Sequence, residues 1–447
     1  MKPRYSILTV VLLAFAAAAN AQSVCTLADC ERMAAENNRK LQNAQFSADA
    51  ATQTRREAFT NYFPEVAGQG AWFNANHGLA RTEIETGGLI SPELGAMLPA
   101  GLLGALPASV PISLLKNGTF GGVTATLPVF AGGRIVNGNK LAKVGEEAAH
   151  LQVRLTEDEV ILTTDTYFWQ IVNLKEKIET IMSVERMLDG LHRDVATAVE
   201  AGMTTENDLL RVKLQIQDLA SNRLKVENGI AVCKMRLAQF IGADMDDFDI
   251  QYSTDDDLRE PVSLYRNPAD AVCDRTETSL LDLNVEAAKL KRRISFGEQL
   301  PSLGVGGGYL YNDLLGRSNN SGILYASVSI PISGWWRGSH AHKRQKLLQR
   351  QAANDRANNI ELMTVETRNT WNELIEAHKQ LRLAETSIAQ AAENLRIVES
   401  AYKAGTVPLT DLLDAQLLFR QSRNQYSDAY SVCRVKTLRY QQITAGR

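Results

Sequence analysis

The stretch Ile360–Val398, IELMTVETRNTWNELIEAHKQLRLAETSIAQAAENLRIV, carries a seam of small and apolar residues at alternating steps of three and four positions. Ten of its twelve seam positions are apolar and two are threonine. The positions are Ile360, Met363, Thr367, Thr370, Leu374, Ala377, Leu381, Ala384, Ile388, Ala391, Leu395 and Val398. A sustained period of 3.5 residues predicts a helix that supercoils along a partner helix.

The same register appears 203 residues earlier, between Glu157 and Val195, where eight of twelve positions are apolar. Neither 134–201 nor 337–404 contains a proline, so each can be one uninterrupted helix. About 66 residues at about 1.5 Å each predict helices about 100 Å long. A helix of this length must lie along partner helices. We expect four shorter helices to cover the long ones, over 26–63, 204–241, 272–299 and 407–444.

Two motifs show that the chain is duplicated. Leu127–Arg134 (LPVFAGGR) resembles Ile330–Arg337 (IPISGWWR), and Ala201–Leu210 (AGMTTENDLL) resembles Ala404–Leu413 (AGTVPLTDLL). Both pairs are 203 residues apart, so the element between the motifs has one fixed length. We therefore predict a first repeat over 22–241, an acidic linker over 242–272 and a second repeat over 273–447.

The first repeat is longer than the second on its strand side. Pro64 and its counterpart Pro301 are 237 residues apart, which places an insertion in the first copy at about 76–118. This segment is rich in Gly, Pro, Ser and Asn, as loops are.

Four segments near the prolines have the length and composition of outer-membrane strands. They are Val66–Phe73, Phe120–Val129, Leu303–Tyr311 and Gly322–Ile332, each about ten residues long. Four strands cannot close a barrel, and an open sheet edge in lipid leaves backbone groups without hydrogen bonds. The chain must then oligomerise, with two copies giving eight strands and three giving twelve.

The N-terminus has the pattern of a signal peptide over 1–21. Lys2 and Arg4 precede an apolar run, Ile7–Ala19, that ends in the Ala19-Asn20-Ala21 cleavage pattern. The run is shorter than the roughly 20 residues of a membrane-spanning helix. The residues before Cys25 are a poor context for lipidation, so we expect an exported and unlipidated chain.

Composition excludes several function classes. With 48 basic and 51 acidic side chains the chain has no basic excess, so no nucleic-acid partner is expected. Five cysteines without CxxC spacing and six scattered histidines disfavour a zinc site and a thiol enzyme. The chain also lacks the GxSxG, P-loop and HExxH motifs, so we expect neither enzyme activity nor a cofactor.

The order of elements, the Leu-Pro turns into each long helix and the block Tyr402–Ala415 resemble the TolC-type outer-membrane efflux family. The resemblance covers 22–447. It implies a homotrimer in outer-membrane lipid, with a twelve-stranded β-barrel continued by a periplasmic α-helical barrel. It also implies passive export, driven by an inner-membrane transporter of RND or ABC type through a periplasmic adaptor. Type I protein secretion is the alternative within this class, and a periplasmic coiled-coil adaptor is the alternative outside it.

The resemblance also assigns roles to the two glycine turns. Gly202, Met203, Gly405 and Thr406 would form the periplasmic mouth that contacts the adaptor. The entrance residues would be Asp208, Asp411, Asp414 and Tyr402. Each aspartate could equally be a favourable acid at a helix start. Val407 stands where the family has a latch arginine, so the closed state must be held differently.

Three other features remain as hypotheses. Trp335 and Trp336 are expected to form an aromatic belt at the membrane interface. Cys30 and Cys273 open equivalent helices and could form a disulfide. The acids of the linker are expected to be a solvated surface, because few basic residues accompany them.

Overall fold

The computed structural model describes residues 23–76, 80–85, 109–114, 117–244, 248–253, 260–314, 317–332 and 334–444. The signal peptide therefore lies outside the described residues. The chain forms two compact units. One comprises Thr52–Gly145 and Glu286–Gln351, and the other comprises Met1–Ala51, Glu146–Val285 and Ala352–Arg447.

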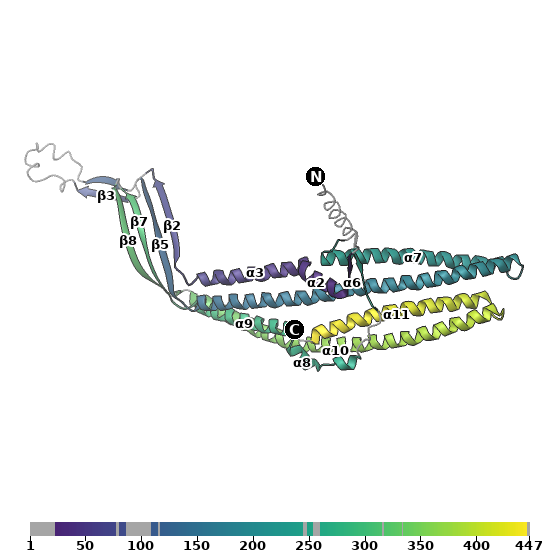
Figure 1. Ribbon diagram of the computed structural model, residues 1–447. Helices are drawn as coiled ribbons and strands as arrows, with labels where there is room; N and C mark the ends of the chain where they lie inside the picture. The colour runs from purple at the N-terminus through teal and green to yellow at the C-terminus, as the bar shows by residue number, and fades with distance from the viewer. Residues whose placement is uncertain are drawn as a thin grey trace, which may run out of the picture. The chain divides into compact units, whose positions relative to one another are not determined.

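The first unit contains an antiparallel sheet in the order β2-β5-β7-β8 (Figure 1). The strands are β2 (Glu65–Asn74), β5 (Asn117–Ala131), β7 (Ser302–Leu314) and β8 (Arg317–Ser329). All four predicted strands are confirmed, and β5 pairs with β7 across the two repeats. Among the described residues, no strand pairs with the outer edge of β2 or β8.

The insertion contains a further hairpin, which the loop prediction missed. β3 (Ala80–Glu85) pairs antiparallel with β4 (Ser109–Leu114). Alternating residues such as Thr82, Ile84, Val110 and Ile112 are β-branched and suit a strand. The residues between the two strands lie outside the described part of the chain.

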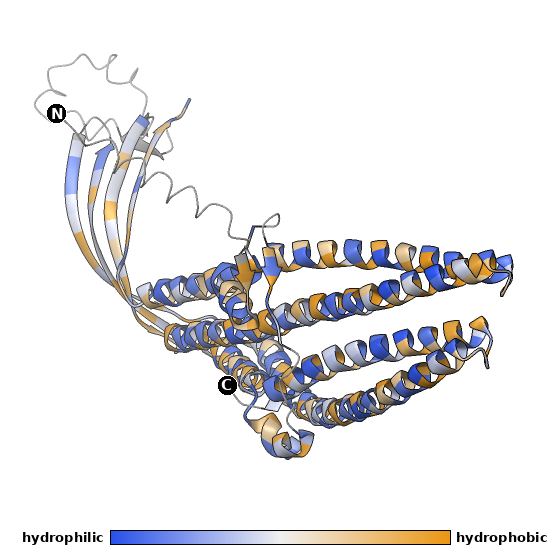
Figure 2. Ribbon diagram, turned by 45° about the vertical axis from the view of Figure 1, so that its right-hand side comes forward, coloured by the Kyte–Doolittle hydropathy of each residue, from blue (hydrophilic) through white to orange (hydrophobic). Residues whose placement is uncertain are grey.

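The long helices are confirmed. α6 (Arg134–Glu200) has 67 residues and α10 (Gly334–Lys403) has 70. α7 (Glu206–Ile241) returns beside α6, and α11 (Leu409–Thr444) returns beside α10 (Figures 1 and 2). The other helices of the repeats are α2 (Leu27–Asn37), α3 (Arg39–Thr60) and α9 (Thr276–Gly297).

The predicted helix over 26–63 is divided at Asn38, which has extended backbone between α2 and α3. The Asn38 side-chain amide donates to the Phe240 carbonyl oxygen over 2.9 Å. Its side-chain oxygen accepts from the backbone N–H of Lys40 over 2.9 Å. The break therefore fixes the start of α3 and ties it to the end of α7.

The seam of α10 is the buried side of that helix. Nine of its twelve predicted positions are buried, and the other three are half-buried. The two seam threonines donate their hydroxyls to carbonyls one turn earlier, Thr367 to Met363 and Thr370 to Glu366. These hydrogen bonds let polar side chains occupy a dry position.

Two apolar clusters hold the helices of the second unit together. One joins α2, α3, α6, α7, α10 and α11 around Phe168, Trp169 and Ile171. It also contains β1 (Ser23–Cys25) and β6 (Phe248–Ile250), which pair in parallel. The other cluster joins α6, α7, α10 and α11 beside the two glycine turns. Figure 2 shows the helices with mixed polar and apolar residues along their length. Within the described residues, no helix has both the length and the hydropathy needed to cross a membrane.

The acidic segment is partly anchored rather than wholly solvated. Its described elements are β6, the 3-10 helix η3 (Pro261–Leu264) and α8 (Pro268–Cys273). Asp249 of β6 pairs with Lys175 at 2.6 Å and with Lys234 at 2.8 Å. These hydrogen bonds hold the pKa of Asp249 below its usual range despite its partial burial. The expectation of a solvated surface is therefore wrong at this residue, and the division into two repeats with a linker remains a prediction.

The suggested disulfide is absent. Cys30 is buried and Cys273 is exposed, and both are free thiols.

One prediction concerns the seam. Leu374 is 1% exposed, so Leu374→Ala leaves a cavity and should lower the free energy of unfolding by about 2–5 kcal/mol. Gln380 lies on the same helix and is exposed and polar, so Gln380→Ala should change the free energy of unfolding by less than about 0.5 kcal/mol. Thermal melting of the purified proteins measures both. Equal melting temperatures would contradict the assignment of the seam.

A buried carboxyl also lies in the helical unit. Asp165 of α6 is 4% exposed, and one of its oxygens has no hydrogen-bond partner. Burial and the neighbouring Glu31 carboxyl raise the pKa of Asp165 to about 8. The folded protein binds this proton more tightly than the unfolded chain does, so this residue lowers stability progressively as the pH rises toward 8.

Asp165→Asn should therefore stabilise the protein at high pH. We expect little change in the free energy of unfolding near pH 4, close to the ordinary pKa of an aspartate, and a gain of at least about 1 kcal/mol at pH 8. The exposed Glu157→Gln on the same helix is the control, and it should show no such pH-dependent gain. A gain for Asp165→Asn that is the same at both pH values would refute the protonated carboxyl.

Candidate functional site

The two glycine turns have the same backbone geometry. Gly202 has φ 71° and Gly405 has φ 73°. In the first turn the N–H of Gly202 bonds to the Val199 carbonyl, and the N–H of Met203 bonds to the Ala198 carbonyl. Gly405 and Thr406 form the equivalent pair of bonds in the second turn. This is the Schellman helix end, whose left-handed residue favours glycine.

The residues next to these glycines are available for contact. Met203 is 82% exposed, which is unusual for so large an apolar side chain. Thr406 is also exposed, although its hydroxyl donates to the Ala401 carbonyl over 2.9 Å. The first turn therefore exposes an apolar side chain, Met203, and the second exposes a polar one, Thr406.

Asp208 is held at the start of α7. Its Oδ2 atom accepts from the Thr204 hydroxyl over 2.7 Å and from the Thr205 hydroxyl over 3.0 Å. Thr205 is the N-cap residue, and its hydroxyl accepts from the backbone N–H of Asp208. The hydrogen bond from Thr204, with the weaker ones from Thr205, lowers the pKa of Asp208. Asp208 thus has a structural task at the helix start, whatever else it does.

Asp411 and Asp414 lie on α11 and are both exposed. Asp411 is in the first turn, where the Thr410 hydroxyl donates to its Oδ1 atom over 3.4 Å. Asp414 is one turn further on, at the edge of a cleft.

Tyr402 connects the two hairpins. It is half-buried and packs against the apolar cluster beside the turns. Burial raises the pKa of Tyr402, and the nearby carboxylates of Asp208 and Asp194 raise it further. The structure therefore brings Tyr402 of α10 close to Asp208 of α7. Val407, which lies in the second turn after Gly405 and Thr406, is half-buried and supplies no charge.

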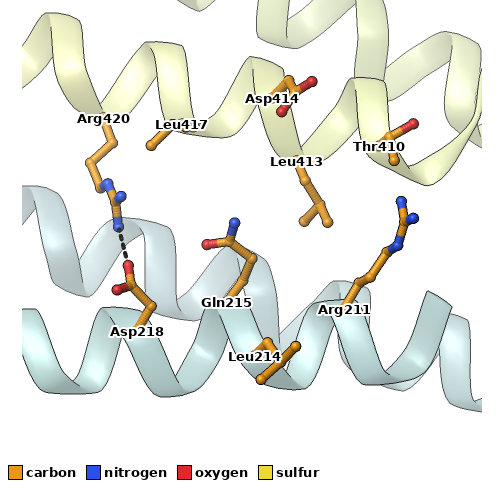
Figure 3. Close-up of a pocket in the computed structure, with 9 residues that line it drawn as sticks. All are labelled: Arg211, Leu214, Gln215, Asp218, Thr410, Leu413, Asp414, Leu417 and Arg420. Carbon is orange, nitrogen blue, oxygen red and sulfur yellow. Dashed lines mark ion pairs between the residues drawn. The ribbon is translucent and has the colours of Figure 1, made fainter. Parts of the chain in front are cut away.

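A cleft of about 520 Å³ separates α7 from α11 just beyond the turns (Figure 3). An ion pair of 3.8 Å joins Arg420 to Asp218 across it. Arg211, Gln215 and Asp218 point from α7 toward α11 in Figure 3. The cleft is lined by Arg211, Leu214, Gln215, Asp218, Thr410, Leu413, Asp414, Leu417 and Arg420.

The basic residues of this cleft were missed at the level of sequence, although a signal existed. Arg211 and Asp414 occupy equivalent positions of the duplication, 203 residues apart, and carry opposite charges. The structure places both on one cleft, where they form no ion pair with each other.

The interface aromatics lie in the other unit. Trp336 is in the first turn of α10 and is 82% exposed. The side chain of Trp335 lies outside what the structure describes. In the described part of the chain, no group of three or more His, Cys, Asp or Glu residues could hold a metal ion.

Comparison with known proteins adds three findings. The family described as "Outer membrane efflux protein" matches residues 279–433. No match was found among curated protein sequences. The structure resembles several solved outer-membrane channels at low sequence identity.

A structure of CusC, a protein that forms a transmembrane channel on folding, has a TM-score of 0.76 at 14% identity. The aligned region covers 94% of this chain and 91% of the CusC chain. The Campylobacter jejuni CmeC outer membrane channel has a TM-score of 0.75 at 15% identity, covering 94% and 85%. The Vibrio cholerae outer membrane protein VceC has a TM-score of 0.73 at 14% identity, covering 94% and 95%.

A prediction tests the backbone of the turns. At Gly405 a Cβ would meet no atom within 4 Å, so Gly405→Ala isolates the cost of a left-handed residue, about 1–2 kcal/mol. Hydrogen exchange in the residues around the turn should increase. Gly190 also has open space but lies inside α6, so Gly190→Ala should slightly stabilise the protein. Unchanged rates of amide hydrogen exchange in Gly405→Ala would show that the turn does not need a left-handed residue at position 405.

Proposed function

We propose that this chain is a member of the outer membrane efflux protein family, whose model matches residues 279–433, and that three copies form one exit duct across the outer membrane and periplasm. In this proposal the chain is an outer-membrane channel protein with periplasmic helices, which the family match and the shared fold of solved channels support. The observation that supports association of copies is the four-stranded sheet, whose two outer edges have no partner among the described strands. Lipid cannot supply the missing hydrogen bonds, so neighbouring copies must supply them. Three copies give the twelve strands of the proposed barrel.

The duct has no energy source of its own in this proposal. An inner-membrane transporter of RND or ABC type drives export, and a periplasmic adaptor connects it to the duct. The adaptor contacts the turns at Gly202, Met203, Gly405 and Thr406. The exposed methionine supports this, because a bare apolar side chain at a helix tip suits a protein contact.

Asp208, Asp411 and Asp414 form the charged entrance of the proposed trimer. Three chains contribute nine carboxylates there. Arg211 lies on the same cleft as Asp414, so three guanidinium groups offset part of that charge. The entrance therefore remains acidic but less so than the carboxylates alone imply. It should prefer cations, because a narrow pore feels charges within about 8 Å at physiological salt.

Tyr402 and the pair between Arg420 and Asp218 hold the closed entrance in place of a latch arginine. The pair is an ion pair between α7 and α11, and Tyr402 packs between the hairpins. Neither contact needs Asp411 or Asp414. Removing Asp411 and Asp414 should therefore alter ion selectivity more than the resting conductance.

The experiment is a reversal-potential measurement on purified protein in planar bilayers. The wild type should prefer K⁺ to Cl⁻, and the triple variant Asp208→Asn, Asp411→Asn, Asp414→Asn should lose most of that preference. Asp355→Asn with Glu361→Gln removes exposed acids of α10 far along the chain from the turns, and should leave selectivity unchanged. An unchanged reversal potential in the triple variant would show that the three aspartates do not set ion selectivity and only stabilise the starts of their helices. An absence of any channel current would contradict the proposed duct itself.

A further inference from the structure

A second cavity lies in the unit that carries the strands. It has a volume of about 870 Å³ and is formed by α6, α9 and α10 close to where these helices join the sheet. α9 leads into β7, and β8 leads into α10. The lining residues are Arg134, Leu141, Lys291, Ile294, Ser295, Glu298, Gln299, Arg337, Gly338, His340, Ala341, Arg344 and Gln345.

The lining is strongly basic and its charges are uncompensated. Arg134, Lys291, Arg337 and Arg344 come from three helices, and none of them forms an ion pair with any described residue. Glu298 is the one carboxylate of the lining, and it too is unpaired. In the helical unit, by contrast, lysines such as Lys175 and Lys436 have carboxylate partners. Four unpaired cations around one concavity create a positive potential that attracts an anion.

The floor of the cavity is rigid. The Gln299 side-chain amide donates to the Gly338 carbonyl over 2.9 Å, which joins α9 to α10. A Cβ at Gly338 would lie 2.5 Å from the Gln299 side chain, so the two helices meet as closely as they can. Ser295, beside them, is buried. The basic side chains therefore stand around a fixed surface rather than on a flexible loop.

The sequence shows the same bias over a longer stretch. Between Lys289 and Arg350 there are ten Lys and Arg residues but only two acids, Glu298 and Asp313. The chain as a whole has a small acidic excess, so this positive charge is a local property.

We propose that this cavity is an anion site that binds a phosphate group. Three of its cations are arginines, whose planar guanidinium groups form paired hydrogen bonds with phosphate oxygens. The phosphate can come from two sources. One is the headgroup of an anionic phospholipid, because the cavity lies at the ends of the membrane strands. The other is a free phosphate-bearing solute. This site is separate from the acidic entrance and does not depend on the proposed export partners.

The test uses the full-length protein in a phosphate-free maltoside detergent, with two arms. In the first, pyrophosphate is titrated by calorimetry. In the second, equal amounts of phosphatidylglycerol and phosphatidylcholine are added, and native mass spectrometry counts the lipids that remain bound. Pyrophosphate binding identifies a site for free phosphate. Selective retention of phosphatidylglycerol identifies a headgroup site. Either result supports the proposal.

Paired variants make the result specific. Arg337→Gln with Arg344→Gln should weaken binding at least about tenfold, because two charge-assisted hydrogen-bond donors are lost. Lys346→Gln with Arg350→Gln removes the same charge from the same helix outside the cavity, and should change binding less than about twofold. Ala341→Glu places a carboxylate in the cavity and should abolish binding, whereas Ala341→Gln, of the same shape, should not.

Three outcomes would overturn the proposal. The first is no binding in either arm. The second is equal weakening by the cavity and control pairs, which would show a diffuse surface effect. The third is binding that survives Ala341→Glu in protein with wild-type melting behaviour.

Discussion

The constraint on which this structure depends is the hydrogen bonding of sheet edges in lipid. Each chain supplies four strands whose inner edges are satisfied, and the outer edges of β2 and β8 have no partner among the described strands. Since hydrocarbon offers no alternative partner, membrane insertion and association of copies must be coupled. The duplicated helices follow the same logic, because each repeat supplies two strands and one long helix of nearly equal length. Association of the sheets therefore sets copies of the helices side by side.

Charge is distributed unevenly along the chain. Acids gather near the two glycine turns, with Arg211 and Arg420 offsetting part of them, whereas uncompensated bases gather where the helices meet the strands. The two clusters lie in different units of the protein.

Much of the fold was predictable because its signals are local and repeated. The 3.5-residue seam, the proline-free stretches and the glycine turns each follow from a few neighbouring residues, and duplication supplied a second copy of each. The missed features depend on contacts between distant residues. Asp249 meets Lys175 across 74 positions, and the cleft needs Arg211 and Asp414 on facing helices. The burial of Asp165 could have been predicted from the sequence. Asp165 shares a helix face with Phe168 and Val172, and so lies on a second buried stripe beside the predicted seam.

The most direct test of the account is the number of chains in the folded membrane protein. Native mass spectrometry of the protein extracted from outer membranes in mild detergent counts them without any assumption about cargo or partners. Unpaired edges on β2 and β8 predict a closed assembly of several chains, and the proposed twelve-stranded barrel sets their number at three, with monomer appearing only on denaturation. A folded, membrane-extracted monomer that retains its strands would contradict the account, because its two sheet edges would then be satisfied without another copy.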